Sequence, residues 1–98
     1  MNFGQALEAL KEGKQVARAG WNGKKMYLWL NKGNLASNGP EPIENKIEAI
    51  REDLFEVGHS DTVTRLPNIN MTAATGSTVT GWLASQTDML AEDWVIID

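Results

Sequence analysis

The apolar residues near the start of the chain recur at the spacing of an amphipathic helix. Four of them lie three or four positions apart and so share one helical face: Phe3, Ala6, Leu7 and Leu10. Asn2 precedes this segment and Gln5 follows three positions later, which is the arrangement of a capping box. Gly13 can adopt the left-handed conformation that ends a helix. The pattern predicts a first helix of about three turns.

Five shorter segments mix apolar and β-branched residues between turn residues, and each predicts a strand. They are residues 16–18, residues 26–30, a segment marked by Leu66, Ile69 and Met71, residues 78–82, and residues 94–97. Asn22-Gly23 favours a two-residue hairpin turn between the first two strands. Both faces of the strand over 26–30 carry large apolar side chains, so we expect it to be covered on both sides or to join a subunit interface.

The middle of the chain differs from the rest because residues 31–42 are rich in turn residues. Four apolar residues then follow helical spacing among charged neighbours, and they predict a helix over about 43–56: Ile43, Ile47, Ile50 and Leu54. Near the end, Ser85 and Asp88 are spaced to cap a short helical turn. The sum is an α+β fold in a single domain over 1–98, with a small antiparallel β-sheet, an N-terminal helix and a helical insertion within 31–65.

Composition narrows the chemistry that such a domain can perform. The 98 residues include no cysteine and one histidine, His59, which excludes thiolate catalysis and a cysteine or multi-histidine metal site. No phosphate-binding loop motif occurs, and His59-Ser60-Asp61 are adjacent residues that cannot form a catalytic triad. We therefore expect a protein that is not an enzyme and holds no cofactor or metal. No apolar run approaches the roughly 20 residues needed to cross a bilayer, and no signal peptide is visible, so we expect a cytoplasmic protein without membrane contact.

The charges are unevenly distributed along the chain. The net charge is −4, which argues against a partner that is polymeric nucleic acid. Residues 1–32 nevertheless contain six basic and two acidic residues, whereas residues 33–98 contain three basic and eleven acidic residues. A local basic patch on an acidic protein suits a small anion, and the alternative is an ordinary mixed surface.

The first candidate binding segment surrounds Trp21, one of four tryptophans. Arg18, Lys24 and neighbouring Lys25 flank it, and such cations can neutralise phosphates. An indole at the end of a hairpin can stack on a base, and Gly20 and Gly23 would let backbone amides approach a ligand closely. From these residues alone, a tight turn whose tryptophan folds back over the core remains an equal alternative.

The second candidate segment is Trp82 to Asp88. Ser85, Gln86 and Asp88 supply a dense set of hydrogen-bonding groups that suit ribose hydroxyls and base edges. The alternative is a helix N-cap followed by a polar turn.

Three parts of the sequence, taken in order, resemble a known family. They are Asn2-Phe3-Gly4-Gln5-Ala6-Leu7 through Gly20-Trp21-Asn22-Gly23-Lys24, then Leu66-Pro67-Asn68-Ile69-Asn70-Met71, then Gly81-Trp82-Leu83-Ala84-Ser85-Gln86-Thr87-Asp88 and on to Trp94. The chain resembles the second type of Thoeris anti-defense protein, a domain of phages and prophages. The resemblance covers residues 1–30 and 66–98, and the longer connection over 31–65 departs from the short members.

The resemblance implies a function and an assembly. Similar proteins are oligomers, typically homotetramers, that act in the host bacterial cytoplasm. They bind a cyclic ADP-ribose isomer, glycocyclic ADP-ribose, and sequester it as a sponge without cleaving it. Some members also bind a cyclic oligonucleotide at separate sites.

We assign expected roles to the candidate residues on this basis. Trp21 would stack on the base or form a pocket wall with Phe3, while Arg18 and Lys24 would hold the diphosphate. Hydroxyls and base edges would be read by Asn22, Ser85, Gln86 and Asp88, with the backbone of Gly23 close to the ligand. Two other classes stay open: a phage structural or protein-interaction module that binds no nucleotide, and a nucleotide-cleaving enzyme.

Overall fold

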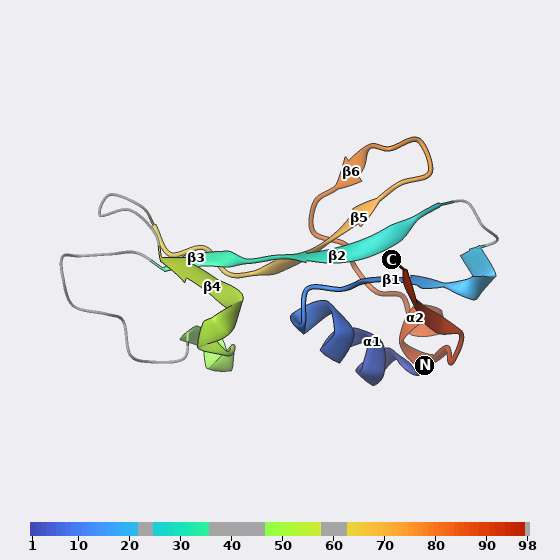
Figure 1. The fold of residues 1–98 in the computed structure, drawn as a ribbon, viewed down its shortest axis with the longest axis horizontal. Helices are drawn as coiled ribbons and strands as arrows, with labels where there is room; N and C mark the ends of the chain where they lie inside the picture. Colours follow the sequence, from blue (N-terminus) through green and yellow to red (C-terminus); the bar gives the residue numbers. More distant parts are fainter. Residues whose placement is uncertain (22–24, 36–46, 58–62, 98) are drawn as a thin grey trace. The chain divides into compact units, whose positions relative to one another are not determined.

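A computed structural model describes residues 1–21, 25–35, 47–57 and 63–97 (Figure 1). Its contacts group the chain into two compact units, residues 1–30 with 69–98 and residues 31–68. The first unit contains both α-helices and the main sheet, and the second nearly coincides with the expected insertion over 31–65. That the chain acts as a single domain stays a prediction.

Helix α1 (Phe3–Lys11) begins and ends where the sequence predicts. The Asn2 side chain accepts from the Gln5 backbone N–H at 2.8 Å, and the Gln5 side chain accepts from the Asn2 N–H at 2.9 Å. These two bonds satisfy N–H groups that have no partner within the helix. At the other end, Gly13 has a φ of 88°, so a residue without a Cβ stands at the left-handed position that ends the helix.

The main sheet has five strands in the order β6-β5-β2-β1-β7. Their bounds are β1 (Gln15–Arg18), β2 (Tyr27–Asn31), β5 (Asn68–Thr72), β6 (Thr78–Val79) and β7 (Trp94–Ile97). The pairs β1–β2, β1–β7 and β5–β6 are antiparallel, with Val16 opposite Leu28 and Ala17 opposite Val95. Since side chains alternate along a strand, Val16 and Leu28 face one side of the sheet while Ala17 and Val95 face the other.

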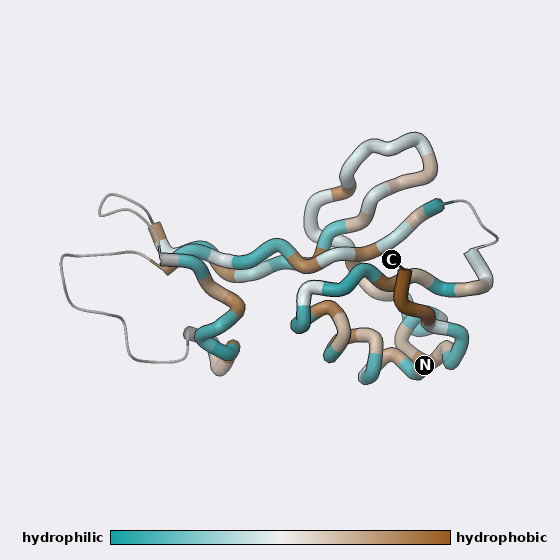
Figure 2. The backbone as a smooth tube through the Cα atoms, in the orientation of Figure 1, coloured by the Kyte–Doolittle hydropathy of each residue, from teal (hydrophilic) through white to brown (hydrophobic). Residues whose placement is uncertain are grey.

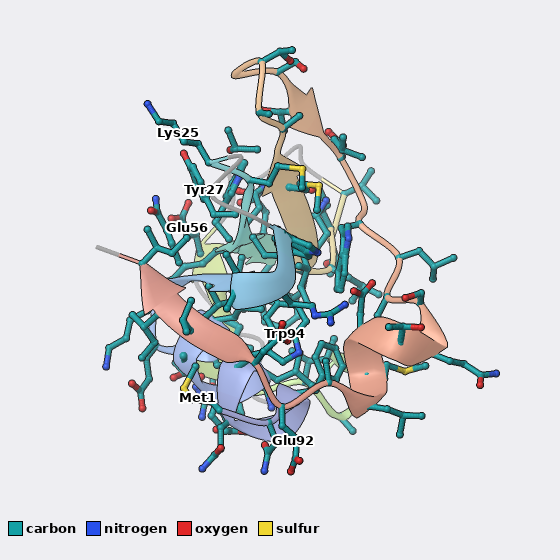
Figure 3. All side chains as sticks on the ribbon, turned by 90° about the vertical axis from the view of Figure 1, so that its right-hand side faces the viewer. Met1, Lys25, Tyr27, Glu56, Glu92 and Trp94 are labelled. Atoms are coloured by element: carbon teal, nitrogen blue, oxygen red, sulfur yellow. The ribbon has the colours of Figure 1, made fainter. Side chains whose placement is uncertain are left out.

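The core of the first unit lies between α1 and one face of this sheet. α1 contacts β1 and β7, and the fully buried side chains there are Leu10, Val16, Leu28 and Trp94. Figure 3 shows Trp94 in the middle of this packing. The first residue of the chain is also tied to Trp94, because the Met1 ammonium donates to the Trp94 carbonyl at 2.7 Å and the Trp94 N–H donates to the Met1 carbonyl at 3.1 Å. The α+β prediction is confirmed.

Helix α2 (Gln86–Leu90) is short and begins at the predicted cap. The Ser85 hydroxyl accepts from the Asp88 N–H at 3.1 Å, while the Ser85 N–H donates to the Asp88 carboxylate, also at 3.1 Å. α2 packs against α1. Neither helix has the length and apolar composition needed to span a membrane, and the described residues contain no other candidate.

The second unit contradicts the predicted helix over 43–56. Its described residues form two 3-10 turns (Ile47–Ala49 and Glu52–Leu54), strand β3 (Gly33–Leu35) and strand β4 (Phe55–Val57), which pair in parallel. Glu48 and Ala49 have φ values of 54° and 59°, which break a helical path. Leu54, from the predicted stripe, and its neighbour Phe55 are both buried, so burial here involves adjacent residues and does not follow helical spacing. Ile43 lies outside the described residues.

Three smaller expectations also change. Strand β6 is only two residues long, because Gly81 turns the chain at a φ of 76° and Trp82 then packs on the core. Leu66 precedes β5 and is exposed. The connection between β1 and β2 runs from residue 19 to residue 26 and begins with a 3-10 turn (Ala19–Trp21), so it is longer than a two-residue hairpin turn; Asn22-Gly23 lies outside the described residues.

Candidate functional site

Trp94 is the centre of an aromatic cluster that includes the candidate residues Trp21 and Phe3. The Phe3 and Trp21 ring centroids each lie 5.5 Å from that of Trp94, and the Trp82 centroid lies 6.2 Å away. Trp21 and Trp82 meet Trp94 edge-on, a geometry that aromatic pairs favour. The buried Trp94 indole N–H donates to the Asp88 carbonyl at 2.9 Å. The two candidate segments of the sequence therefore meet at one side chain.

Arg18, at the end of β1, forms two ion pairs. Its Nε donates to Asp93 Oδ1 at 2.9 Å, and its Nη1 donates to Asp88 Oδ1 at 3.1 Å. The Arg18 and Asp88 side chains are only 18% and 14% exposed, so solvent screens this pair less than a surface pair. The pKa of Arg18 is raised above its ordinary value, first by the hydrogen bond to Asp93 and then by that to Asp88. The guanidinium charge is thus compensated by two carboxylates.

The two aspartates remain ionised in this arrangement. Burial raises the pKa of Asp88, but the hydrogen bonds from Ser85 and Arg18 outweigh it and leave the pKa lowered. The pKa of Asp93 is lowered by the hydrogen bond from Arg18 and then by that from the Gly20 backbone. Both carboxylates are charged at neutral pH because their negative form receives the hydrogen bonds.

Asp93 also holds the turn that carries Trp21. Its Oδ2 accepts from the Gly20 N–H at 2.8 Å, and its backbone carbonyl accepts from the Ala19 N–H at 2.9 Å. A Cβ at position 20 would lie 2.9 Å from Asp93 Oδ2, closer than real Cβ atoms approach other atoms. The sequence therefore has glycine where the carboxylate passes next to the backbone.

A hollow of about 260 Å³ opens beside this turn. Its lining comes from β1, the turn, the start of the following segment, and β7: Ala17, Arg18, Ala19, Trp21, Lys25, Met26, Val95 and Ile97. Ala17 and Val95 place it on the sheet face opposite to α1. Lys25 is exposed and extends away from the chain (Figure 3). The hollow thus combines the half-buried indole of Trp21, an apolar floor and a cation, Lys25, that is not the partner of Asp88 or Asp93.

Two comparisons with known proteins match nearly the whole chain. A family model described as "Tad2-like: Thoeris anti-defense 2-like domain" matches residues 1–97. The chain belongs to the Thoeris anti-defense 2-like family. It is 41% identical over 98 residues to "Thoeris anti-defense 2" of Bacillus phage SP01, and the match covers 99% of this chain and 94% of that protein. The match runs through residues 31–65, so this relative also has a segment that corresponds to them.

The structure of this family member places the candidate residues in different surroundings. Trp21 and Arg18 line the hollow, whereas Phe3 packs against Trp82 and Trp94. Ser85, Gln86 and Asp88 lie at the start of α2 and do not line the hollow in the single chain. The remaining three candidates, Asn22, Gly23 and Lys24, lie outside the described residues.

The sequence reasoning missed several residues of this site. Val95 and Ile97 appeared only as strand residues, because nothing in the local pattern shows that β7 pairs with β1 beside Trp21. Asp93 was missed for a similar reason: it is 75 positions from Arg18 in the sequence. Lys25 lies in the basic segment around Trp21, and that segment was the sequence signal that could have identified it as a site residue.

The ion pairs of Arg18 predict how stability depends on pH. Asp88 and Asp93 have lowered folded pKa values, so their contribution is fully present above the ordinary aspartate pKa of 3.8 and is lost as the pH falls through the folded values. In urea denaturation, Arg18→Gln should be less stable than the parent protein at neutral pH, and the difference should narrow in acid. Lys14→Gln, which removes the exposed pair with Glu12, is the control and should change stability by less than about 0.5 kcal/mol. A difference between Arg18→Gln and the parent that stays constant into acid would contradict this prediction.

Proposed function

We propose that this protein is a phage anti-Thoeris protein that binds a cyclic nucleotide immune signal, glycocyclic ADP-ribose, and sequesters it without cleavage. Membership of the Thoeris anti-defense 2-like family supports the anti-Thoeris role. The observation that carries the ligand proposal is the position of Trp21. Its ring is fixed on one side by Trp94, and the same residue forms a wall of an open hollow that contains Lys25.

The hollow has the features that a nucleotide requires. A base can stack on Trp21, which has a fixed orientation and so loses little entropy when the ligand binds. Met26, Val95 and Ile97 give the floor an apolar character that suits a base or the carbon face of a sugar. Lys25 supplies a positive charge for a phosphate.

The role of Arg18 changes in this proposal. Two of its nitrogens already donate to Asp93 and Asp88, and these two carboxylates compensate its positive charge, so it is poorly suited to bind a diphosphate. We therefore assign the phosphate contact to Lys25, together with the neighbouring Lys24 expected from the sequence. Arg18 instead connects β1 to Asp88 and Asp93 and so supports the site without contacting the phosphate.

Sequestration without cleavage fits the protonation states of the two carboxylates beside the turn. A general acid or base works best with a pKa near the operating pH. Asp88 and Asp93, the carboxylates beside Trp94 and the turn, have lowered pKa values and are bonded to Arg18, so neither is poised to donate a proton to a leaving group.

A second copy of the chain completes the site in this proposal. The hollow is smaller than the roughly 300–1,000 Å³ of typical small-molecule pockets, and Val95 and Ile97 of β7 line it. β7 is an edge strand, hydrophobic along its length (Figure 2), with Val95 42% and Ile96 43% exposed on opposite faces. Unpaired apolar edges of this kind favour association with another strand. We therefore propose that two subunits meet at β7 and enclose ligands between them, and that such dimers pair into the homotetramer implied by the family resemblance. Ser85, Gln86 and Asp88 do not line the hollow of the single chain, so in this proposal they would contact a ligand only from the second copy.

A specific observation also favours the second candidate function, a protein-interaction module. Leu83, which precedes α2, and Leu90, its last residue, are 89% and 80% exposed, and exposed apolar side chains that lie together can mark a protein contact. In that case the aromatic residues serve only the core, and no nucleotide protects the fold.

Binding and release of intact ligand distinguish these functions. Calorimetry should show tight binding of glycocyclic ADP-ribose, with a nanomolar Kd corresponding to about −12 kcal/mol. After heat denaturation of the complex, mass spectrometry should recover the ligand unchanged. Ordinary ADP-ribose is the control and should bind much more weakly. Recovery of hydrolysed ligand would identify an enzyme instead, and absence of binding would favour the interaction module.

Replacement of Trp21 tests the pocket wall. Trp21→Ala removes a stacking surface of about 1–3 kcal/mol, so affinity should fall roughly 5- to 150-fold. If Trp21 acts only in the core, the change should instead cost about 3–5 kcal/mol of stability. Binding and thermal melting are measured on the same variant, and Lys14→Gln, an exposed change before the opposite end of β1, serves as the control. A large drop in melting temperature with normal binding by the remaining folded protein would refute the assignment.

The proposed assembly is tested by light scattering. Across micromolar concentrations the parent protein should have the mass of a tetramer, because an exposed apolar edge strand is buried by self-association. Val95→Lys places a charge on the exposed face of β7 and should shift the mass towards smaller species. A monomer mass for the parent protein at every concentration would remove this proposal.

A further inference from the structure

We infer that Asp93 is the positioning residue of the binding site: it does not touch the ligand, but it fixes the turn that presents Trp21 to the hollow. The inference rests on the proposed binding function and adds a residue to it. It starts from a closed set of contacts. Asp93 accepts hydrogen bonds from Arg18 and from the Gly20 N–H. Trp21, which follows Gly20, packs on Trp94. The Trp94 indole donates to the Asp88 carbonyl, and the Asp88 carboxylate accepts from Arg18, which closes the set.

Asp93 is suited to this role because each of its oxygens has a different partner. Oδ1 accepts from Arg18 at 2.9 Å, Oδ2 accepts from the Gly20 N–H at 2.8 Å, and the backbone carbonyl accepts from the Ala19 N–H at 2.9 Å. One residue thus binds the end of β1 and two successive residues of the turn. Its own position is fixed because the next residue, Trp94, begins β7 and is fully buried.

The contacts of Trp21 make this restraint necessary. Its ring packs edge-on against Trp94 at a centroid distance of 5.5 Å, and the same half-buried residue forms a wall of the hollow. A rigid stacking surface requires that its supporting contacts be rigid as well. The hydrogen bonds of Asp93 to the two residues before Trp21 supply that support.

Two variants disturb these contacts in different ways. Asp93→Asn removes the charge and leaves a side chain that cannot accept from both Arg18 and Gly20 as the carboxylate does. Gly20→Ala keeps the charge but places a Cβ 2.9 Å from Asp93 Oδ2, which forces the carboxylate away from the turn. The matched control is Glu92→Gln, which removes the same charge at the neighbouring, exposed position; Figure 3 shows Glu92 away from Trp94.

The first readout does not require a ligand. In nitrogen-15 spectra each of the four tryptophans gives an indole N–H resonance, and Trp21→Phe identifies that of residue 21. Asp93→Asn and Gly20→Ala should shift or broaden the Trp21 resonance. The resonance of Trp29, whose indole donates to Thr72 Oγ1 at 3.2 Å on the sheet, should stay in place and report an intact fold. Glu92→Gln should leave both resonances unchanged.

The second readout is affinity for glycocyclic ADP-ribose. Both variants should bind about tenfold more weakly than the parent protein, while Glu92→Gln binds normally. An unchanged Trp21 resonance in both variants overturns the inference, as does a displaced Trp21 with normal affinity. Loss of all four indole resonances in both variants would assign these bonds to the core and also overturn it. If the parent protein itself binds no ligand, the proposed function fails, and the Trp21 resonance alone decides whether Asp93 positions the turn.

Discussion

The burial of Trp94 is the constraint on which the first unit depends. A fully buried indole must both fill space and satisfy its N–H, and here it contacts three aromatic rings and donates to the Asp88 carbonyl. Trp94 also pairs with Met1 through its backbone and opposes Arg18 across the β1–β7 pair. Trp94 therefore positions four segments: helix α1, the turn after β1, the segment before α2, and α2 itself.

The same packing explains why a charged cluster lies beside an aromatic one. Arg18 stands at the rim of the core, where an unpaired cation would be costly, and Asp88 and Asp93 offset that cost. These pairs connect β1 to α2 and to the start of β7, segments separated by 70 or more residues in the sequence. A basic residue that resembles a phosphate ligand in the sequence thus acts between protein carboxylates.

The contacts of Trp94 and Asp93 determine the shape of the hollow. Its indole is oriented by packing on Trp94, its turn is restrained by Asp93, and its remaining cation, Lys25, is exposed to solvent. A site that is rigid before it binds loses less entropy on binding, which would suit the proposed sequestration. Because β7 lines the hollow and is also an edge strand, self-association becomes part of the binding proposal.

The sequence alone determined the elements whose signals are local. The Asn2–Gln5 and Ser85–Asp88 caps follow from contacts within one turn, and the α+β class follows from spacing over a few residues. The resemblance to the family likewise required only the order of motifs. The predicted helix over 43–56 failed because β4 forms by pairing with β3, a distant partner that the apolar spacing of the segment does not reveal.

Trp21 was identified from its neighbours in the sequence. Three other features depend on which strands become neighbours: the position of Trp21 in the wall of the hollow, the pairing of Arg18 with Asp88 and Asp93, and the contribution of Val95. Long-range pairing brings these residues together, and only the tertiary structure decides it.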